Sequence, residues 1–225
     1  MNTNTTILAT LEKEISAAGI YTGYQGSFFE KTLELLRANI REEEATKKGN
    51  KKPFKIIEKM IKGSNYKYQP LFKMCHPYGE KYGFLDSYRL FLSDDNLGYE
   101  VATPERAFKI EPLYNINKAD YIDIEINIAE LRYFSKVAKP RGKNETPQPF
   151  IIRTPDGLAG FNPSFLLDLI EYSGSNTIKY IKHNAPIYSN DYNALLLPVH
   201  LKENSEDFYN EYRAKWFDEK KEAAA

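Results

Sequence analysis

The stretch GFNPSFLLDLIEYSG, residues 160–174, and the three apolar segments that follow it decide the fold. Asn162 is a residue type that caps helices, and Pro163 suits the first helical position because its φ angle is already fixed near the helical value. Apolar residues then recur at the spacing of one helix face, at Phe165, Leu166, Leu169 and Ile170. Strands are predicted over residues 177–183, 186–189 and 194–201. This part of the chain is therefore expected to combine one helix with three strands.

The chain before this stretch also mixes strands and helices. Residues 121–126 alternate, with isoleucines on one face and Asp123 and Glu125 on the other, and so predict a strand. Asn127 is the expected cap of a helix that runs to about Lys139. Further strands are predicted over residues 71–76, 82–93, 99–102, 107–110 and 150–153, with the turn PYGEK joining the first two.

Helices frame this mixed region on both sides. They are predicted over residues 5–18, 28–45, 53–62 and 206–221. Ser27 is expected to cap the second helix, and Pro53 is expected to occupy the first position of the third. The last helix carries Tyr209, Tyr212 and Trp216 on its inward face. The element order lacks the repeating strand–helix–strand rhythm of doubly wound folds and favours the α+β class.

The composition describes a folded protein without net charge. The 225 residues include 31 Lys and Arg against 31 Asp and Glu, which excludes DNA binding through overall charge alone but leaves a local basic patch open. Aromatic residues make up 14% of the chain, and this apolar content argues against wholesale disorder. The single cysteine, Cys75, allows no intramolecular disulfide and no Cys-based zinc site.

Neither a secretory signal nor a membrane span is expected. The N-terminal residues lack a basic stretch followed by a long apolar stretch. No segment approaches the roughly 18 apolar residues that a membrane-spanning helix needs. We therefore expect a cytoplasmic protein with no membrane partner.

Two segments of the chain resemble the bacterial sliding clamp, the beta subunit of DNA polymerase III. Residues 83–93, GFLDSYRLFLS, resemble the clamp's strand motif ATD-(S/G)-(H/Y)-RLA, here as LDSYRL. Residues 157–201 resemble the last half-domain of a clamp, which reads GFN-x-x-YLLD-x-L, then a Ser-Pro or Ala-Pro strand, then IMPVRL. The corresponding residues here are Gly160–Asn162, Phe165–Asp168, Ala185–Pro186 and Leu196–Leu201.

The resemblance implies a DNA-clamp-like domain, an antiparallel sheet with packed helices, over residues 51–203. Residues 1–50 then form an N-terminal helical extension, and residues 204–225 form a C-terminal helix and tail. Neither has a recognised counterpart in a clamp. A clamp chain has three similar domains and closes a ring as a dimer, whereas this chain has room for one domain or two trimmed ones. A ring would therefore require a homo-oligomer.

In clamps, the D-x-x-RL motif and the MPVRL strand line a hydrophobic pocket for partner peptides, which are of the short Gln-x-Leu-Phe type. The resemblance assigns the partner-peptide pocket here to Tyr88, Arg89, Leu90, Leu197, Pro198, Val199 and His200. Tyr88 and Arg89 would rim the pocket, and Leu90, Leu197 and Val199 would form its floor. The alternative is a structural arginine on an ordinary strand edge. The two motifs come from neighbouring domains in clamps, so the sequence leaves open whether they meet in this chain.

A run of lysines is the clearest charge signal. The residues Lys51, Lys52, Lys55, Lys59 and Lys62 belong to the predicted third helix, and all but the second recur on one helix face. Such a face suits the phosphate backbone of double-stranded DNA, which needs positive charge but no sequence readout. These five lysines are therefore the predicted DNA-binding residues. The alternative is a solvated helix face, which is common among lysine-rich helices.

We predict a non-enzymatic, sliding-clamp-like processivity factor of DNA replication or repair, of the kind that a phage or mobile element carries. Its partners would be DNA, replication proteins or clamp-binding peptides, and further copies of the chain. The alternative is an interaction or regulatory protein that keeps the clamp fold, binds a protein partner and forms no ring. An enzyme has little support, because the sequence contains neither a phosphate-cradling glycine loop nor a nucleophile elbow. No catalytic residue, metal or cofactor is predicted.

Overall fold

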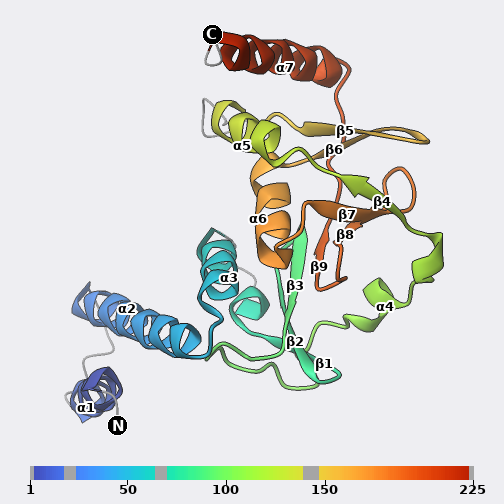
Figure 1. The fold of residues 1–225 in the computed structure, drawn as a ribbon. Coiled ribbons are helices and arrows are strands. Elements are labelled where there is room, and N and C mark those ends of the chain that lie inside the picture. The colour runs from blue at the N-terminus through green and yellow to red at the C-terminus, as the bar shows by residue number, and fades with distance from the viewer. Residues whose placement is uncertain (1–2, 18–23, 64–69, 139–146, 223–225) are drawn as a thin grey trace. The chain divides into compact units, whose positions relative to one another are not determined.

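The computed structural model describes residues 3–17, 24–63, 70–138 and 147–222 (Figure 1). The chain divides into two compact units. The first consists of Met1–Lys59 and Leu97–Tyr99, and the second of Met60–Asn96 and Glu100–Ala225. This division reflects packing alone, and the predicted domain boundaries after residues 50 and 203 stay predictions.

The first unit is helical. Helix α1 (Thr3–Ala17) packs against α2 (Tyr24–Lys47), and helix α3 (Lys51–Gly63) begins in this unit and ends in the second. Arg37 on α2 pairs with Glu12 on α1 at 2.7 Å. The buried apolar side chains of this unit include Ile15, Leu33, Ile40, Phe54 and Ile57. The three predicted N-terminal helices are therefore confirmed as elements, except that residue 18 lies outside the described residues.

Two predicted helix starts are wrong. Helix α2 begins at Tyr24, so Ser27 lies inside it, and α3 begins at Lys51, so Pro53 is its third residue. The first four N–H groups of a helix have no intrahelical partner, so a proline in the first turn removes no hydrogen bond. Gly26, which is also in the first turn of α2, weakens that helix by about 1 kcal/mol relative to alanine but does not end it.

The second unit is built around an antiparallel sheet of seven strands among the described residues. The strand order is β1 (His76–Tyr78), β2 (Lys81–Leu85), β3 (Arg89–Ser93), β9 (Ala194–Leu196), β8 (Ile187–Ser189), β7 (Thr177–Tyr180) and β4 (Ile122–Glu125). Strands β3 and β9 are far apart in the sequence and pair at the centre, with Leu90 opposite Leu195. Helices beside an antiparallel sheet confirm the predicted α+β class, whereas the clamp-like fold stays a prediction.

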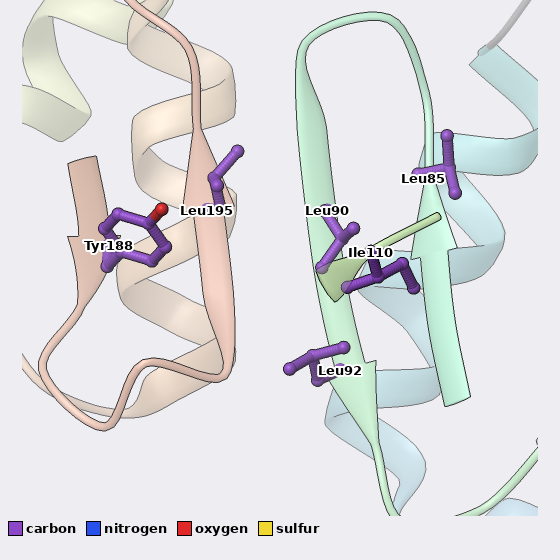
Figure 2. Packing of buried hydrophobic residues seen from close by; sticks show 6 residues of the cluster. All are labelled: Leu85, Leu90, Leu92, Ile110, Tyr188 and Leu195. Carbon is purple, nitrogen blue, oxygen red and sulfur yellow. The ribbon is translucent and has the colours of Figure 1, made fainter. Parts of the chain in front are cut away.

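The two faces of this sheet are covered differently. On one face helix α6 (Pro163–Ser173) packs against β8 and β9, and the ring of Tyr172 lies 4.7 Å from that of Phe91 on β3. Successive strand residues point to opposite faces, so the neighbours of Phe91 point away from α6. Figure 2 shows this other face, here called the leucine-rich face, whose buried residues are Leu85, Leu90, Leu92, Tyr188 and Leu195. Ile110, from the chain between β3 and β4, packs onto it.

A two-stranded sheet and further helices complete the second unit. Strand β5 (Phe150–Thr154) pairs with β6 (Gly157–Phe161), and helix α7 (Ser205–Glu222) packs on β5 and on α5 (Ile128–Val137). The ring of Tyr209 on α7 lies 5.2 Å from that of Phe134 and 5.5 Å from that of Phe150, which confirms its predicted inward position. The short turns are η1 (Pro70–Lys73), α4 (Glu111–Tyr114) and η2 (Lys118–Asp120).

The strand predictions for residues 71–93 need correction. Residues 70–73 form the single turn η1, and β1 begins only at His76. The single strand predicted over residues 82–93 is two strands, β2 and β3. Asp86 separates them, because its Oδ1 atom accepts hydrogen bonds from the amides of Tyr88 and Arg89, both at 2.8 Å, and so closes a turn.

Two further strand predictions are wrong as well. Residues 99–102 form only one bridge, between Val101 and Cys75, and residues 107–110 form no strand. Residues 107–110 belong to the irregular segment that covers the leucine-rich face. Strand β6 is present although no strand was predicted for residues 157–161.

Asn162 provides a test of the local signals that begin α6. Its side-chain oxygen accepts hydrogen bonds from the amides of Ser164 and Phe165 at 3.0 and 3.3 Å, which confirms the predicted cap. Asn162→Ala leaves these amides unpaired and should lower the free energy of unfolding by about 1 kcal/mol. Asn162→Asp keeps an acceptor and should cost less. Urea denaturation measures both variants, and an alanine variant as stable as the parent would contradict the cap.

Candidate functional site

A cavity of about 550 Å³ opens on the leucine-rich face of the sheet. Ligand pockets typically span roughly 300–1,000 Å³. Its walls come from η1, from the β2–β3 hairpin, from the chain between β3 and β4, and from the end of β9. The apolar lining residues are Leu71, Phe72, Leu85, Leu90, Phe108, Leu113, Leu195 and Leu197. The cavity is thus an apolar hollow of the size that binds a ligand.

The cavity exists because an irregular segment covers this face in place of a long helix. Residues 103–121 have only the turns α4 and η2 as regular structure. Ile110 packs closely on β2. A Cβ atom added at Gly83 would lie 2.2 Å from the Cδ1 atom of Ile110. Phe108 and Leu113 flank Ile110 in the sequence and border the hollow. The segment therefore seals one part of the face tightly and leaves the neighbouring part open.

Two aromatic rings stand at the cavity. Tyr88 and Phe108 both line it, and they keep 46% and 42% of their surface exposed. The Tyr88 backbone is fixed from two sides, because its amide donates to Asp86 and its carbonyl accepts from the Leu197 amide at 2.9 Å. Exposed aromatic residues beside an apolar hollow are typical anchors of protein interfaces.

Arg89 borders the cavity, but its guanidinium group is bound elsewhere in the protein. It begins β3 next to Leu90, so strand alternation directs its side chain to the opposite face, toward α6. Its Nη1 and Nη2 atoms donate to Asp168 Oδ2 at 2.8 Å and to Asp86 Oδ2 at 2.7 Å, and its Cζ atom lies 3.8 Å from the centre of the Phe165 ring. Only 6% of the Arg89 surface is exposed, and its guanidinium contacts Asp86, Asp168 and Phe165, which favours the structural alternative; its predicted place at the pocket rim stays a prediction.

The predicted pocket residues are divided between two hollows. Tyr88, Arg89, Leu90 and Leu197 border the large cavity, whereas Pro198, Val199 and His200 border a separate hollow of about 80 Å³. The backbone explains the division, because the Leu197 amide bonds to Tyr88 while the Val199 amide bonds to the Gly160 carbonyl on β6 at 2.9 Å. The chain passes from one sheet to the other between these residues, so Val199 is not part of the floor.

The lining of the cavity is mainly apolar. Within the described residues no group of three or more His, Cys, Asp or Glu side chains could hold a metal ion. Cys75 is fully buried, and burial raises the pKa of its thiol to about 11, so the thiol stays protonated at neutral pH and is a poor nucleophile. In the described part of the chain, no helix combines the length and the apolar character that crossing a membrane requires.

The predicted DNA-binding residues all have exposed side chains on α3: Lys51, Lys52, Lys55, Lys59 and Lys62. Glu42 on α2 pairs with Lys51 at 3.9 Å and with Lys55 at 3.3 Å, which reduces the positive charge at the start of the helix. Glu58, the acidic residue within the lysine run, is 8% exposed and pairs with Arg41 at 3.7 Å. The lysine face therefore points to solvent while its acidic neighbour is buried.

The chain matches no protein-family model, no curated protein and no solved structure. The resemblance of residues 83–93 and 157–201 to the sliding clamp therefore stays a prediction. The function of the cavity has to be inferred from its geometry and chemistry.

Several cavity residues were not singled out from the sequence. Leu71 and Phe72 lie in a wrongly predicted strand, and Phe108 and Leu113 lie in a segment without a clear period. The signal that could have found them is apolar content without periodicity. A segment that carries aromatic and branched residues but forms no helix or strand of its own has to cover an apolar face elsewhere.

Mutation of the buried ion pairs tests whether they stabilise the fold around the cavity. These pairs join Arg89 to Asp86 and Asp168. Arg89→Ala removes the guanidinium that pairs with two buried carboxylates, so the free energy of unfolding should fall by about 3–5 kcal/mol. The matched control is Arg153→Ala, because the side chains of Arg153 and Glu206 are 70% and 45% exposed. Loss of this exposed pair should cost less than about 1 kcal/mol. Urea denaturation measures both variants.

A compensated variant keeps this test informative where Arg89→Ala does not fold. Combining Arg89→Met with Asp86→Asn and Asp168→Leu removes all three charges together, and apolar replacement of a buried ion pair is often neutral. We expect the triple variant to recover most of the lost stability. A triple variant as unstable as Arg89→Ala would show that charge pairing is not what holds this region.

Proposed function

We propose that this protein is a non-enzymatic binding protein that captures a segment of a partner protein on its leucine-rich face. The observation that carries the proposal is the apolar cavity of about 550 Å³ beside the exposed rings of Tyr88 and Phe108. Full burial of a Leu or Phe side chain contributes roughly 1.5–3 kcal/mol. The proposed occupant is an extended peptide with a leucine and an aromatic residue close together.

The polar residues around the cavity favour an uncharged anchor. Asp86 and Arg89 pair with each other at 2.7 Å, and Arg89 also pairs with Asp168 at 2.8 Å, so each of these charges already has a partner within the protein. A charged ligand group would lose water here without gaining a counter-ion from them. An apolar side chain, by contrast, would remove leucine surface from water.

The sliding-clamp resemblance supports the same use of this surface. Leu90 and Leu197 belong to the two segments that would line a clamp's peptide pocket, and both border one cavity here. The proposal therefore includes a role in DNA replication or repair, in the cytoplasm, with replication proteins as partners. The alternative is an interaction or regulatory protein that forms no ring. This alternative requires only the cavity and therefore has the better geometric support. A ring of several copies stays a prediction.

A capped peptide of the Gln-x-Leu-Phe type tests the cavity, with alanines in place of Leu and Phe as the control peptide. Burial of the two side chains, at about 3–6 kcal/mol, predicts a Kd of roughly 0.05–5 mM. NMR titration of the ¹⁵N-labelled protein measures it. The largest shifts should fall on the amides of Tyr88, Phe108 and Leu197, and the control peptide should cause none.

A pair of matched variants completes this test. Leu197→Lys places a charge on the cavity wall and should abolish binding of the peptide. Ile122→Lys introduces the same charge on β4 at another apolar residue, 43% exposed, and should bind the peptide like the parent. Binding that survives Leu197→Lys, or shifts that map away from the cavity, would contradict the proposal.

The exposed lysines of α3 support a second candidate activity, contact with the backbone of double-stranded DNA. Their spacing along one helix brings several positive charges to the same exposed side. Such a contact needs no base readout and no net charge on the whole protein. It is compatible with peptide binding, because the lysines and the cavity involve different residues.

Charge removal on α3 tests the DNA contact. The variant Lys51→Gln, Lys52→Gln and Lys55→Gln should weaken duplex binding and reduce the slope of log affinity against log salt by up to about 2.7, or about 0.9 for each phosphate contact. The control is a second triple variant with the same charge change at the exposed lysines Lys13, Lys136 and Lys202. Fluorescence anisotropy at several salt concentrations measures both. Equal losses in the two triple variants would contradict a specific α3 face.

A further inference from the structure

His76 joins two walls of the cavity through both nitrogens of its ring. The side chain is fully buried at the start of β1. The backbone N–H of Phe108 donates to Nδ1 at 3.0 Å, so Nδ1 carries no proton. Nε2 lies 3.0 Å from the carbonyl oxygen of Leu71 and donates to it. These bonds together require the neutral imidazole with its proton on Nε2.

The two residues that His76 holds both border the cavity. Leu71 belongs to η1, and Phe108 belongs to the irregular segment between β3 and β4. Neither residue is part of a strand, so sheet hydrogen bonds do not fix these two walls. The imidazole ties both of them to β1, and thereby to the sheet that forms the floor of the cavity.

We propose that His76 is a positioning residue for the cavity, and that its protonation releases the Phe108 wall and weakens the binding of an apolar peptide. A proton on Nδ1 would face the N–H of Phe108, so an acceptor would become a second donor and the hydrogen bond would be lost. The new charge would also lie in a fully buried position. This inference rests on the proposed function of the cavity and adds its regulation by pH.

The surroundings of His76 disfavour its charged form. The segments next to it carry the charged residues Lys73, Glu80, Lys81, Glu100, Glu105, Arg106, Lys109 and Glu111, all with exposed or half-buried side chains. The adjacent thiol of Cys75 is neutral. Within the described residues no carboxylate or other charged side chain bonds to the imidazole, whose two nitrogens both meet backbone groups. The ring therefore has no counter-charge that would hold a proton on it.

The direction of the pH effect follows from this environment. Burial lowers the pKa of His76, and the hydrogen bond to the Leu71 carbonyl opposes that shift only in part. The unfolded chain, with a histidine pKa of about 6.5, then binds the proton more readily than the folded protein. The stabilisation from the neutral ring is therefore complete above about pH 6.5, and it is lost as the pH falls through the lowered pKa of His76 in the folded protein.

The first arm of the test requires no ligand. The variant His183→Asn with His200→Asn removes the two exposed histidines and leaves His76 as the only one. NMR from pH 8 to pH 5 should show the Nε2–H tautomer at high pH and a Phe108 amide that shifts with the same midpoint as the His76 ring. If the chemical shift of the Phe108 amide does not change as His76 titrates, the proposal is overturned. This holds independently of the result for peptide binding.

The second arm uses the capped Gln-x-Leu-Phe peptide, which has no titrating group. Its Kd should be constant wherever the NMR titration shows His76 to be neutral, and should weaken at least about threefold where His76 is protonated, with circular dichroism showing that the protein is folded at each pH. His76→Gln, whose amide can donate and accept without titrating, should bind with a Kd independent of pH. A constant Kd in the parent, or a pH dependence that persists in His76→Gln, overturns the proposal. A peptide that binds at no pH contradicts the proposed function instead, and the Phe108 titration then decides the His76 linkage.

Discussion

The guanidinium of Arg89 lies between two carboxylates, one from the turn before β3 and one from α6, and the rest of the binding surface depends on this contact. Asp86 and Asp168 pair with it at 2.7 and 2.8 Å, and the ring of Phe165 covers it. Because Arg89 is tied to α6, the next residue along the strand, Leu90, has to face the other side of the sheet. One buried charge thus orients β3 and fixes the turn that carries Tyr88.

The cavity follows from the unequal cover of the sheet's two faces. Helix α6 presents a regular apolar side to one face, and its Tyr172 bonds through the hydroxyl to the Leu92 carbonyl at 2.8 Å. The other face is covered by residues 103–121, whose backbone follows no single period. Ile110 closes that cover tightly over β2, and the apolar hollow lies beside it. A sizeable apolar hollow with exposed rings at its border is a feature that usually serves binding.

Sequence patterns that span only a few residues predicted the corresponding helices and strands well. The caps at Asn127 and Asn162, the alternation before Asn127 and the helical period after Asn162 each depend on neighbours in the sequence, and the structure contains the expected elements. The break between β2 and β3 was missed, although the Asp86 side chain that causes it is only two residues from Tyr88. Side chains that close turns inside an apolar run are hard to separate from strand residues by pattern alone.

The candidate site was predictable only in part, because its geometry depends on distant contacts. Leu90 and Leu197 border one cavity, a proximity that the sequence had left open. The role of Arg89 depends on Asp168, which lies on another element, and strand alternation alone does not reveal that partner. Val199 is separated from Leu197 by the crossing of the chain onto β6, which no local pattern signals. The walls formed by η1 and by Phe108 come from segments without periodicity.

The geometry of the cavity indicates that its walls are fixed before any ligand binds. Amide hydrogen exchange, followed by NMR on the protein without ligand, tests this most directly. The amides of Arg89, Phe108 and Leu197 donate to Asp86 Oδ1, to His76 Nδ1 and to the Tyr88 carbonyl, and none of these is a helix bond. We expect all three amides to be protected from exchange. Exchange of these amides at the rate of an unstructured chain, while the other amides of β3 stay protected, would contradict a preformed cavity.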